Sequence, residues 1–212
     1  MRRISYLVVI AVLLASPCLA LGQSLEELLK AVHSDDAKVV GELLDRGLSP
    51  NTTDKDGNTI LMTAARLGYS DLVALLIARK ATVNSRNPHG DTALMFACLQ
   101  GNPGLVKLLA EHGAEINRSG WTPLGYAAFG GNPDVVRFLL SKGADKNAVE
   151  PNGYTPLMLA VRNGNQAAAR ELLYANVDLE YAAPDGATAL SLANKGGNAA
   201  MVELLKRAGA TK

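Results

Sequence analysis

Residues 153–165 read Gly-Tyr-Thr-Pro-Leu-Met-Leu-Ala-Val-Arg-Asn-Gly-Asn, and this stretch decides the fold. Thr155 is a residue type that caps the N-terminus of a helix, because its side-chain oxygen accepts a hydrogen bond from a free backbone N–H. Pro156 suits the first helical position, where its missing N–H costs no hydrogen bond. Leu157 and Val161 then lie one turn apart on a single face. The stretch therefore predicts a short helix that begins after the threonine and buries one apolar side.

The same motif recurs along the chain at a nearly constant spacing. Its first glycine stands at position 57, 90, 120, 153 or 186, which gives three steps of 33 residues and one of 30. A fixed period in this range is typical of a solenoid, in which a unit cannot bury its apolar face alone and stacks on its neighbours. A solenoid offers a long continuous surface rather than a deep pocket.

A second apolar segment follows each copy of the motif and predicts a second helix in every unit. These helices are expected to begin near Asp71, Pro103, Pro133, Gln166 and Ala199. A residue suited to a left-handed backbone closes them, and in four units it is Gly47, Gly113, Gly143 or Gly209. Lys80 and Asn176 hold this place in two other units. Asparagine tolerates a positive φ, whereas lysine tolerates it less well, so the unit of Lys80 is expected to be locally weaker.

This pattern resembles the ankyrin repeat, whose core motif is Gly-x-Thr-Pro-Leu-His-x-Ala-Ala followed by a Leu-Leu pair, Gly-Ala and Asn. Here it reads Thr122-Pro123-Leu124, Ala127-Ala128, Leu139-Leu140, Gly143-Ala144 and Asn147. The resemblance implies an all-α ankyrin-repeat solenoid of six helix-turn-helix units with short hairpin fingers, one unit being shortened by three residues. The expected units are 24–56, 57–89, 90–119, 120–152, 153–185 and 186–212, within one domain that spans residues 23–212. The histidine of the family motif is replaced by Met62, Met95, Gly125, Met158 and Ser191.

The first 22 residues differ in composition from the repeats. Two arginines are followed by an unbroken apolar run over residues 6–15 and then by small residues. This order is typical of a secretory signal peptide, and the run is too short for a helix that spans a bilayer. We expect residues 1–22 to be a signal peptide cleaved after Gly22, or alternatively after Ala20. The chain then resembles exported bacterial ankyrin proteins, located in the periplasm or secreted, without a membrane anchor after cleavage.

Two other interpretations of this segment fit less well. Cys18 stands where a lipid-modified cysteine would, but Pro17 before it does not fit a lipidation motif. The arginine pair is also found in twin-arginine signals, but Ser5 occupies a place where those signals have an apolar residue. If Cys18 leaves with the signal, Cys98 is the only thiol left. The mature chain then has no internal disulfide, and packing alone stabilises it.

No catalytic constellation occurs in the sequence. The histidines His33, His89 and His112 fall at different places in different units and lack metal-ligand spacing. Neither a Gly-x-Ser-x-Gly elbow nor a phosphate-binding glycine loop is present. The formal net charge of +1 offers no concentrated basic surface for nucleic acid. We expect a monomer that is not an enzyme and that binds no cofactor, metal or nucleic acid.

The resemblance also implies where a protein partner binds. In ankyrin-like arrays the finger tips and the exposed side of the first helices line a concave groove. The positions expected to contact the partner are Asn58, Arg66, Asp91, Leu99, Trp121, Phe129, Tyr154 and Arg162, with Asn152 and Asn163 in the wider set. Trp, Tyr and Arg often dominate binding energy, so the aromatic residues and Arg162 are the principal candidates.

Two alternatives stay open at this surface. Trp121 either contacts the partner or lies flat on its neighbours and shields the stack. The finger before it spans three residues, from Asn117 to Gly120, whereas other fingers span six. This gap either admits a loop or helix of the partner or is a neutral deletion in a tolerant turn.

The expected function is that of a non-enzymatic protein-binding module or scaffold that acts in the periplasm and holds its partner in the concave groove. Two narrower roles are compatible with this expectation. One is an inhibitor or immunity protein that occludes a toxic enzyme. The other is an accessory protein for a periplasmic oxidative-stress enzyme such as a catalase, since exported bacterial ankyrin proteins are associated with roles of this kind.

Overall fold

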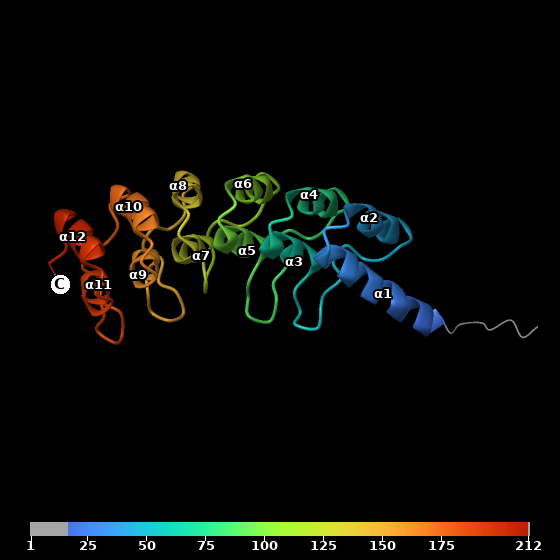
Figure 1. Ribbon diagram of the computed structural model, residues 1–212, viewed down its shortest axis with the longest axis horizontal. Coiled ribbons are helices and arrows are strands. Elements are labelled where there is room, and N and C mark those ends of the chain that lie inside the picture. Colours follow the sequence, from blue (N-terminus) through green and yellow to red (C-terminus); the bar gives the residue numbers. More distant parts are fainter. Residues whose placement is uncertain (1–16, 212) are drawn as a thin grey trace, which may run out of the picture.

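The computed structural model describes residues 17–211, with side chains from Ser24 onwards. Its helices are α1 (Pro17–His33), α2 (Ala37–Asp45), α3 (Ile60–Leu67), α4 (Ser70–Ala78), α5 (Ala93–Gln100), α6 (Pro103–Glu111), α7 (Pro123–Gly130), α8 (Pro133–Ser141), α9 (Pro156–Arg162), α10 (Gln166–Tyr174), α11 (Ala189–Lys195) and α12 (Ala199–Arg207). Consecutive helices form six pairs, and the pairs stack one after another in chain order (Figure 1). The expectation of an all-α solenoid of six helix-turn-helix units is confirmed.

Every first helix from α3 onwards begins directly after a threonine. The side-chain oxygens of these threonines accept a hydrogen bond from the backbone N–H three residues further on. The capping residues are Thr59, Thr92, Thr122, Thr155 and Thr188. This bond satisfies one of the N–H groups that the start of a helix leaves open. The predicted caps are therefore confirmed, and local chemistry fixes where the first helices begin.

The second helices begin within one residue of the predicted positions and end at a left-handed residue. Gly113 follows α6 with a φ of 83°. The same place is held by Lys80 with a φ of 67° and by Asn176 with a φ of 55°. A lysine in this conformation has its Cβ close to the following carbonyl oxygen. The expected positive φ at Lys80 is therefore confirmed, and the weakness of its unit stays a prediction.

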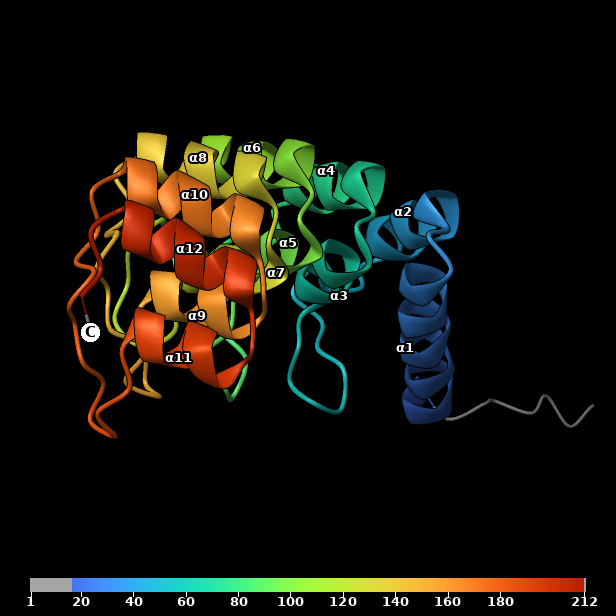
Figure 2. The same cartoon turned by 60° about the vertical axis from the view of Figure 1, so that its left-hand side comes forward.

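The helices form two rows. α3, α5, α7, α9 and α11 pack against one another in order, and so do α2, α4, α6, α8 and α10. Figure 1 shows that the stack bends with the second helices on its outer side, and Figure 2 shows the two rows one above the other. Leu, Val and Ala side chains between the rows form one continuous core. Because every unit depends on its neighbours for burial, the inner surface is held in a fixed curve.

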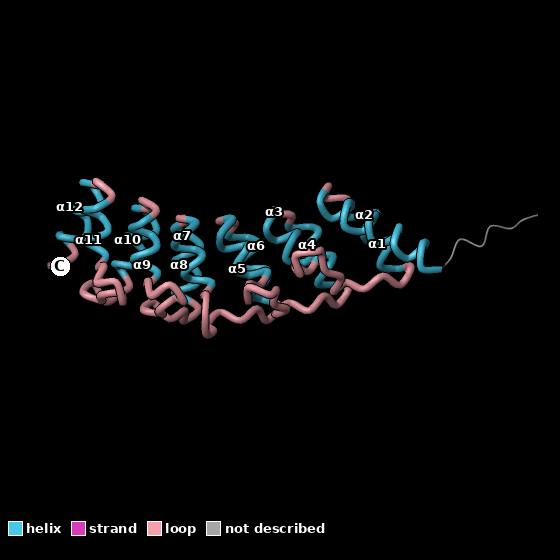
Figure 3. Tube along the Cα trace, turned by 90° about the horizontal axis from the view of Figure 1, so that it is seen from below, coloured by secondary structure: helices cyan, strands magenta, loops and turns pink. Residues whose placement is uncertain are grey.

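The fingers project from one side of the stack (Figure 3), and side-chain hydrogen bonds tie each finger to the next. Asn84, for example, donates to the Gly113 carbonyl at 2.8 Å and accepts from the Glu115 N–H at 3.0 Å. Equivalent bonds to the next unit are made by Asn51, Asn117 and Asn147. This asparagine ladder fixes the spacing of the fingers, and hence the places of any groups they present.

The expected signal peptide falls largely outside the described residues, since positions 1–16 are not described. α1 runs through the expected cleavage position after Gly22. Beyond this position α1 packs on α2 and α3, and its Leu28 and Val32 are fully buried. Cleavage after Gly22 would therefore leave the buried part of the first unit intact.

In the described part of the chain, no helix combines the length and the apolar character needed to cross a lipid bilayer.

Candidate binding cleft

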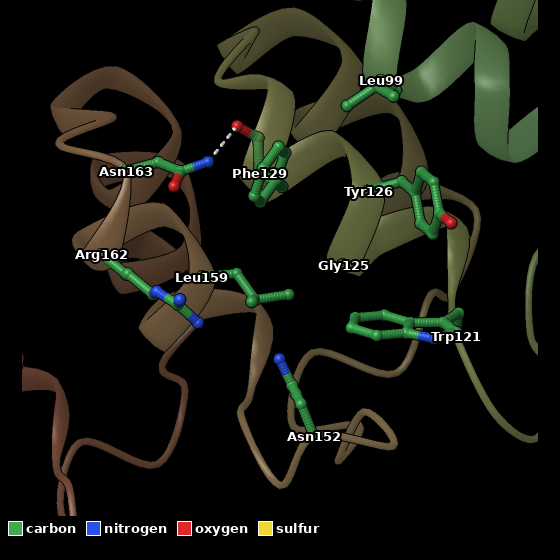
Figure 4. Close-up of a pocket in the computed structure, with 9 residues that line it drawn as sticks. All are labelled: Leu99, Trp121, Gly125, Tyr126, Phe129, Asn152, Leu159, Arg162 and Asn163. Atoms are coloured by element: carbon green, nitrogen blue, oxygen red, sulfur yellow. Dashed lines mark hydrogen bonds between the residues drawn. The ribbon is translucent and has the colours of Figure 1, made fainter.

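A cleft of about 480 Å³ lies on the inner side of the stack, between the fourth and fifth units. Its lining residues are Leu99, Trp121, Gly125, Tyr126, Phe129, Asn152, Leu159, Arg162 and Asn163 (Figure 4). They come from α5, α7 and α9 and from the fingers that precede α7 and α9. The volume is in the range of clefts that hold a small ligand or a few side chains of a partner.

One wall of the cleft is aromatic and is held by internal contacts. The rings of Trp121 and Tyr126 meet edge to face, with centroids 6.1 Å apart and an angle of 87° between the planes. The Tyr126 hydroxyl donates a hydrogen bond to Asp91 at 2.6 Å. Burial, followed by this bond to a carboxylate, raises the pKa of Tyr126, so the hydroxyl stays protonated as the donor. The half-buried Trp121 is thus positioned before any partner arrives.

Phe129 faces this wall from the end of α7. Its side chain is 50% exposed although it is large and apolar. In Figure 4 its ring points into the space between Leu159 and Trp121. An exposed aromatic side chain beside other apolar groups is the kind of feature that marks an interaction site.

The opposite end of the cleft is polar. The Arg162 guanidinium lies over the ring of Tyr154, with 5.7 Å between its central carbon and the ring centroid. Asn163 donates a hydrogen bond from Nδ2 to the Phe129 carbonyl at 3.0 Å, which ties α9 to the end of α7. Asn152 uses its Oδ1 to accept from the Tyr154 N–H at 3.0 Å. Figure 4 shows its amide nitrogen directed into the cleft.

A buried carboxylate, that of Glu150, binds the residue that follows the shortened finger. Glu150, in the finger before α9, is 2% exposed, and it accepts hydrogen bonds from the N–H and the hydroxyl of Thr122. Thr122 stands directly after Trp121 at the start of α7, so Glu150 ties the finger before α9 to the short finger before α7. A Cβ at Gly125 would lie 2.1 Å from Oε1 of Glu150. The missing side chain at Gly125 therefore makes room for this carboxylate beneath the cleft.

Burial also changes the ionisation of Glu150. Desolvation raises its pKa from the ordinary value of 4.5 to about 7, and the two hydrogen bonds from Thr122 oppose this rise without cancelling it. The group therefore titrates close to neutral pH. Gly125 occupies the place of the family's histidine above this carboxylate.

The structure brings four of the eight predicted contact residues together. Leu99, Trp121, Phe129 and Arg162 all line the cleft. Tyr154 lies beside it, contacts Arg162 through its ring and donates a hydrogen bond to Asp185 of the next finger at 3.2 Å. For Trp121, the indole meets Tyr126 edge to face and also lines the cleft, so that contact with a partner stays a prediction.

The remaining three predicted residues lie elsewhere. Asp91 is only 8% exposed and is held by Tyr126 and by Asn87 Nδ2 at 3.1 Å. Asn58 accepts from Asn87 Nδ2 at 2.8 Å, within the same finger network. Arg66 is exposed on α3, two units away from the cleft. These positions therefore do not belong to the cleft, and the structure assigns Asp91 and Asn58 hydrogen bonds that support the stack.

Three cleft residues were not predicted from the sequence. Tyr126 and Leu159 sit at helix positions that other units use for packing, so their pattern gives no sign of a cleft. Gly125 differs from the family motif, which has a histidine at this position. The combination of Gly125 with a glutamate in the next finger is the one signal that sequence reasoning could have followed.

The described residues show neither a metal-ligand cluster nor a reactive thiol at the cleft. Among the described residues, no three His, Cys, Asp or Glu side chains are placed to hold a metal ion. Cys98 is fully buried, and desolvation raises the pKa of its thiol, which keeps it in the unreactive form. The cleft thus presents recognition groups: aromatic faces, a guanidinium and amide donors.

Comparison with known proteins agrees with the repeat architecture. A family model described as ankyrin repeats (3 copies) matches residues 28–119, 79–150 and 145–212. These overlapping matches together extend over residues 28–212, which is most of the chain. The search of curated proteins gave no significant match.

Proposed function

The chain belongs to the ankyrin repeat family, and from that premise we propose that it binds one partner protein in the cleft between α7 and α9. Ankyrin repeat proteins are generally non-enzymatic interaction modules, so the coarse function follows from the family. The observation that supports the place of binding is the preformed aromatic cleft, where the half-exposed Phe129 faces Trp121 and Leu159.

The cleft is suited to be the centre of a larger contact. Residues that dominate binding energy are enriched in Trp, Tyr and Arg and cluster in pockets from which the partner excludes water. Trp121 and Arg162 are of these types, and both are held in place by an aromatic neighbour before binding. Side chains that are ordered in advance lose little entropy when the partner arrives. A standard interface of about 800 Å² per partner would extend from the cleft onto the adjoining fingers.

The proposal includes export of the protein. It rests on the order of charged, apolar and small residues over positions 1–22, which is that of a cleavable secretory signal. The partner is then a protein of the periplasm or of the cell exterior. Inhibition of a toxic enzyme and support of an oxidative-stress enzyme are narrower roles within this proposal, and the identity of the captured partner distinguishes them.

The proposal is tested by capture of the partner with a matched pair of variants. Phe129→Ala removes a cleft side chain that is 50% exposed, and Tyr174→Ala removes an aromatic side chain that is 78% exposed at the end of α10 on the outer row. Periplasmic extract is passed over immobilised wild type and both variants, and captured proteins are identified by mass spectrometry. A protein retained by wild type and Tyr174→Ala but lost from Phe129→Ala supports the proposal. Equal retention by all three refutes the assignment of the cleft.

A further inference from the structure

Two hydrogen-bond donors at the polar end of the cleft are free. They are the guanidinium of Arg162 and Nδ2 of Asn152, which Figure 4 shows directed into the cleft. Within the described part of the chain, neither group makes a hydrogen bond or ion pair to another residue. None of the nine lining residues is an aspartate or glutamate. An unpaired guanidinium beside a free amide N–H favours a ligand that brings oxygen atoms and negative charge.

The carboxylates nearest to the cleft are already engaged. Both oxygens of Glu150 accept hydrogen bonds from Thr122, below the cleft. Asp91 accepts from Tyr126 behind the aromatic wall. Asp185, on the next finger, accepts from the Ala187 N–H at 3.0 Å and from Tyr154. No carboxylate of the described residues thus pairs with the guanidinium of Arg162.

Arg162 differs in this respect from several arginines elsewhere in the fold. Arg137, for example, pairs with Glu171 at 2.7 Å on the outer row, and salt bridges are also made by Arg79, Arg86 and Arg207. Arg162 is instead oriented by the face of Tyr154. Stacking on an aromatic face leaves the edge of a guanidinium free to donate two parallel bonds, which is the geometry that a carboxylate accepts.

We infer that the cleft takes an exposed loop of the partner in which a large apolar side chain stands beside an aspartate or glutamate. This inference rests on the proposed function and specifies the chemistry of the partner. The apolar side chain occupies the space between Phe129, Leu159 and Trp121. The carboxylate forms an ion pair with Arg162 and accepts a hydrogen bond from Nδ2 of Asn152. Charge complementarity and the apolar wall together determine which sequences fit.

An acidic side chain within a loop fits better than a carboxylate at a chain terminus. Terminal carboxylates are typically captured by consecutive backbone N–H groups. The donors of this cleft belong to side chains, and the N–H of Gly125 is already used by Oγ1 of Thr122 at 2.9 Å. The shortened finger before Trp121 extends less far than its neighbours (Figure 1), and on our inference the loop of the partner passes over this finger.

The test uses a phage library that displays random peptides, each closed into a short loop by a disulfide. The library is panned against the whole protein. We expect enriched peptides to carry Asp or Glu within two positions of Phe, Trp, Tyr or Leu. A synthetic enriched peptide is then titrated against wild type, Arg162→Gln and the matched control Arg170→Gln, which removes an exposed arginine from α10 in the same unit. Arg162→Gln should weaken binding of the peptide roughly tenfold or more. Replacing the acidic residue of the peptide by its amide should have a similar effect on wild type. Arg170→Gln should leave the affinity unchanged.

The other outcomes separate the inference from the proposed function. Enrichment of neutral or basic peptides whose binding is lost in Phe129→Ala overturns the acidic partner and leaves the cleft as the binding site. Acidic peptides that bind Arg162→Gln as well as wild type also overturn the inference. A library that yields no binder, or binders that Phe129→Ala retains in full, contradicts both.

Discussion

Glu150→Gln should change the pH dependence of stability more than any other single substitution at the cleft. The carboxylate is 2% exposed and lies among the short finger, Gly125 and the start of α7. Its glutamine analogue has almost the same shape and keeps a carbonyl oxygen for the Thr122 N–H. What it lacks is the charge, so the comparison isolates the ionisation of one buried group.

The size of the effect follows from the pKa of Glu150, which folding raises from 4.5 to about 7. Below pH 4.5 the group is protonated in both the folded and the unfolded chain. Between these two values the unfolded chain loses its proton first, so folding must take up a proton and the free energy of unfolding falls as pH rises. Above about pH 7 the loss is complete, and it amounts to about 3 kcal/mol, since a tenfold difference in proton affinity is worth about 1.4 kcal/mol.

The assay is urea unfolding of wild type and Glu150→Gln at a series of pH values from 4.5 to 8, followed by circular dichroism and by the fluorescence of Trp121, the single tryptophan. We expect the stability of the variant relative to wild type to rise by about 3 kcal/mol across this range. Glu42→Gln, which removes an exposed glutamate of α2, serves as the control and should show no such rise. Parallel pH profiles for Glu150→Gln and wild type would show that the carboxylate is in water, and would refute the packing beneath the cleft.

Three further predictions concern stability and reactivity. Lys80→Gly should raise the free energy of unfolding in urea by about 1 kcal/mol, because glycine adopts the φ of 67° without strain. Asn176→Gly should raise it by only about a few tenths of a kcal/mol, because asparagine tolerates this conformation. Equal effects would contradict the strain argument. Gly130→Ala should lower the free energy of unfolding by about 1–3 kcal/mol in the same assay, since its Cβ would lie 2.5 Å from the Leu99 carbonyl oxygen. An unchanged unfolding midpoint would show that α5 and α7 are further apart at this point. Cys98 should react with a thiol reagent only when the protein unfolds, so that fast labelling of the native protein would contradict its complete burial.

The features that local chemistry decides could be predicted from the sequence. A threonine before an apolar run fixes the start of a helix, and a glycine after the second helix fixes its termination, so the start of α7 and the end of α8 follow from Thr122 and Gly143. The period then implied stacking. Even the positive φ at Lys80 could be predicted, because the equivalent residue is glycine in four other units and asparagine in the fifth.

The features that depend on contacts between units could not be predicted in the same way. Asp91 has the sequence position of a finger-tip contact, yet Tyr126 from the next unit covers and binds it. Glu150 reads as one more polar finger residue until it is paired with the glycine at position 125, and the packing then shows that Gly125 leaves space for it. The asparagine ladder was visible as a repeated residue type, but its partners are determined by the distance between neighbouring fingers. Such side chains are placed by tertiary packing, which a single repeat does not encode.

The most direct test of recognition in the cleft is photo-crosslinking with the partner captured by the wild-type protein. A photo-reactive benzoylphenylalanine replaces either Phe129, which is 50% exposed in the cleft, or Tyr174, which is 78% exposed on the outer row. After irradiation, we predict a covalent adduct with the partner from position 129 and none from position 174. An adduct from position 174 alone would place the partner on the outer helices and contradict the account.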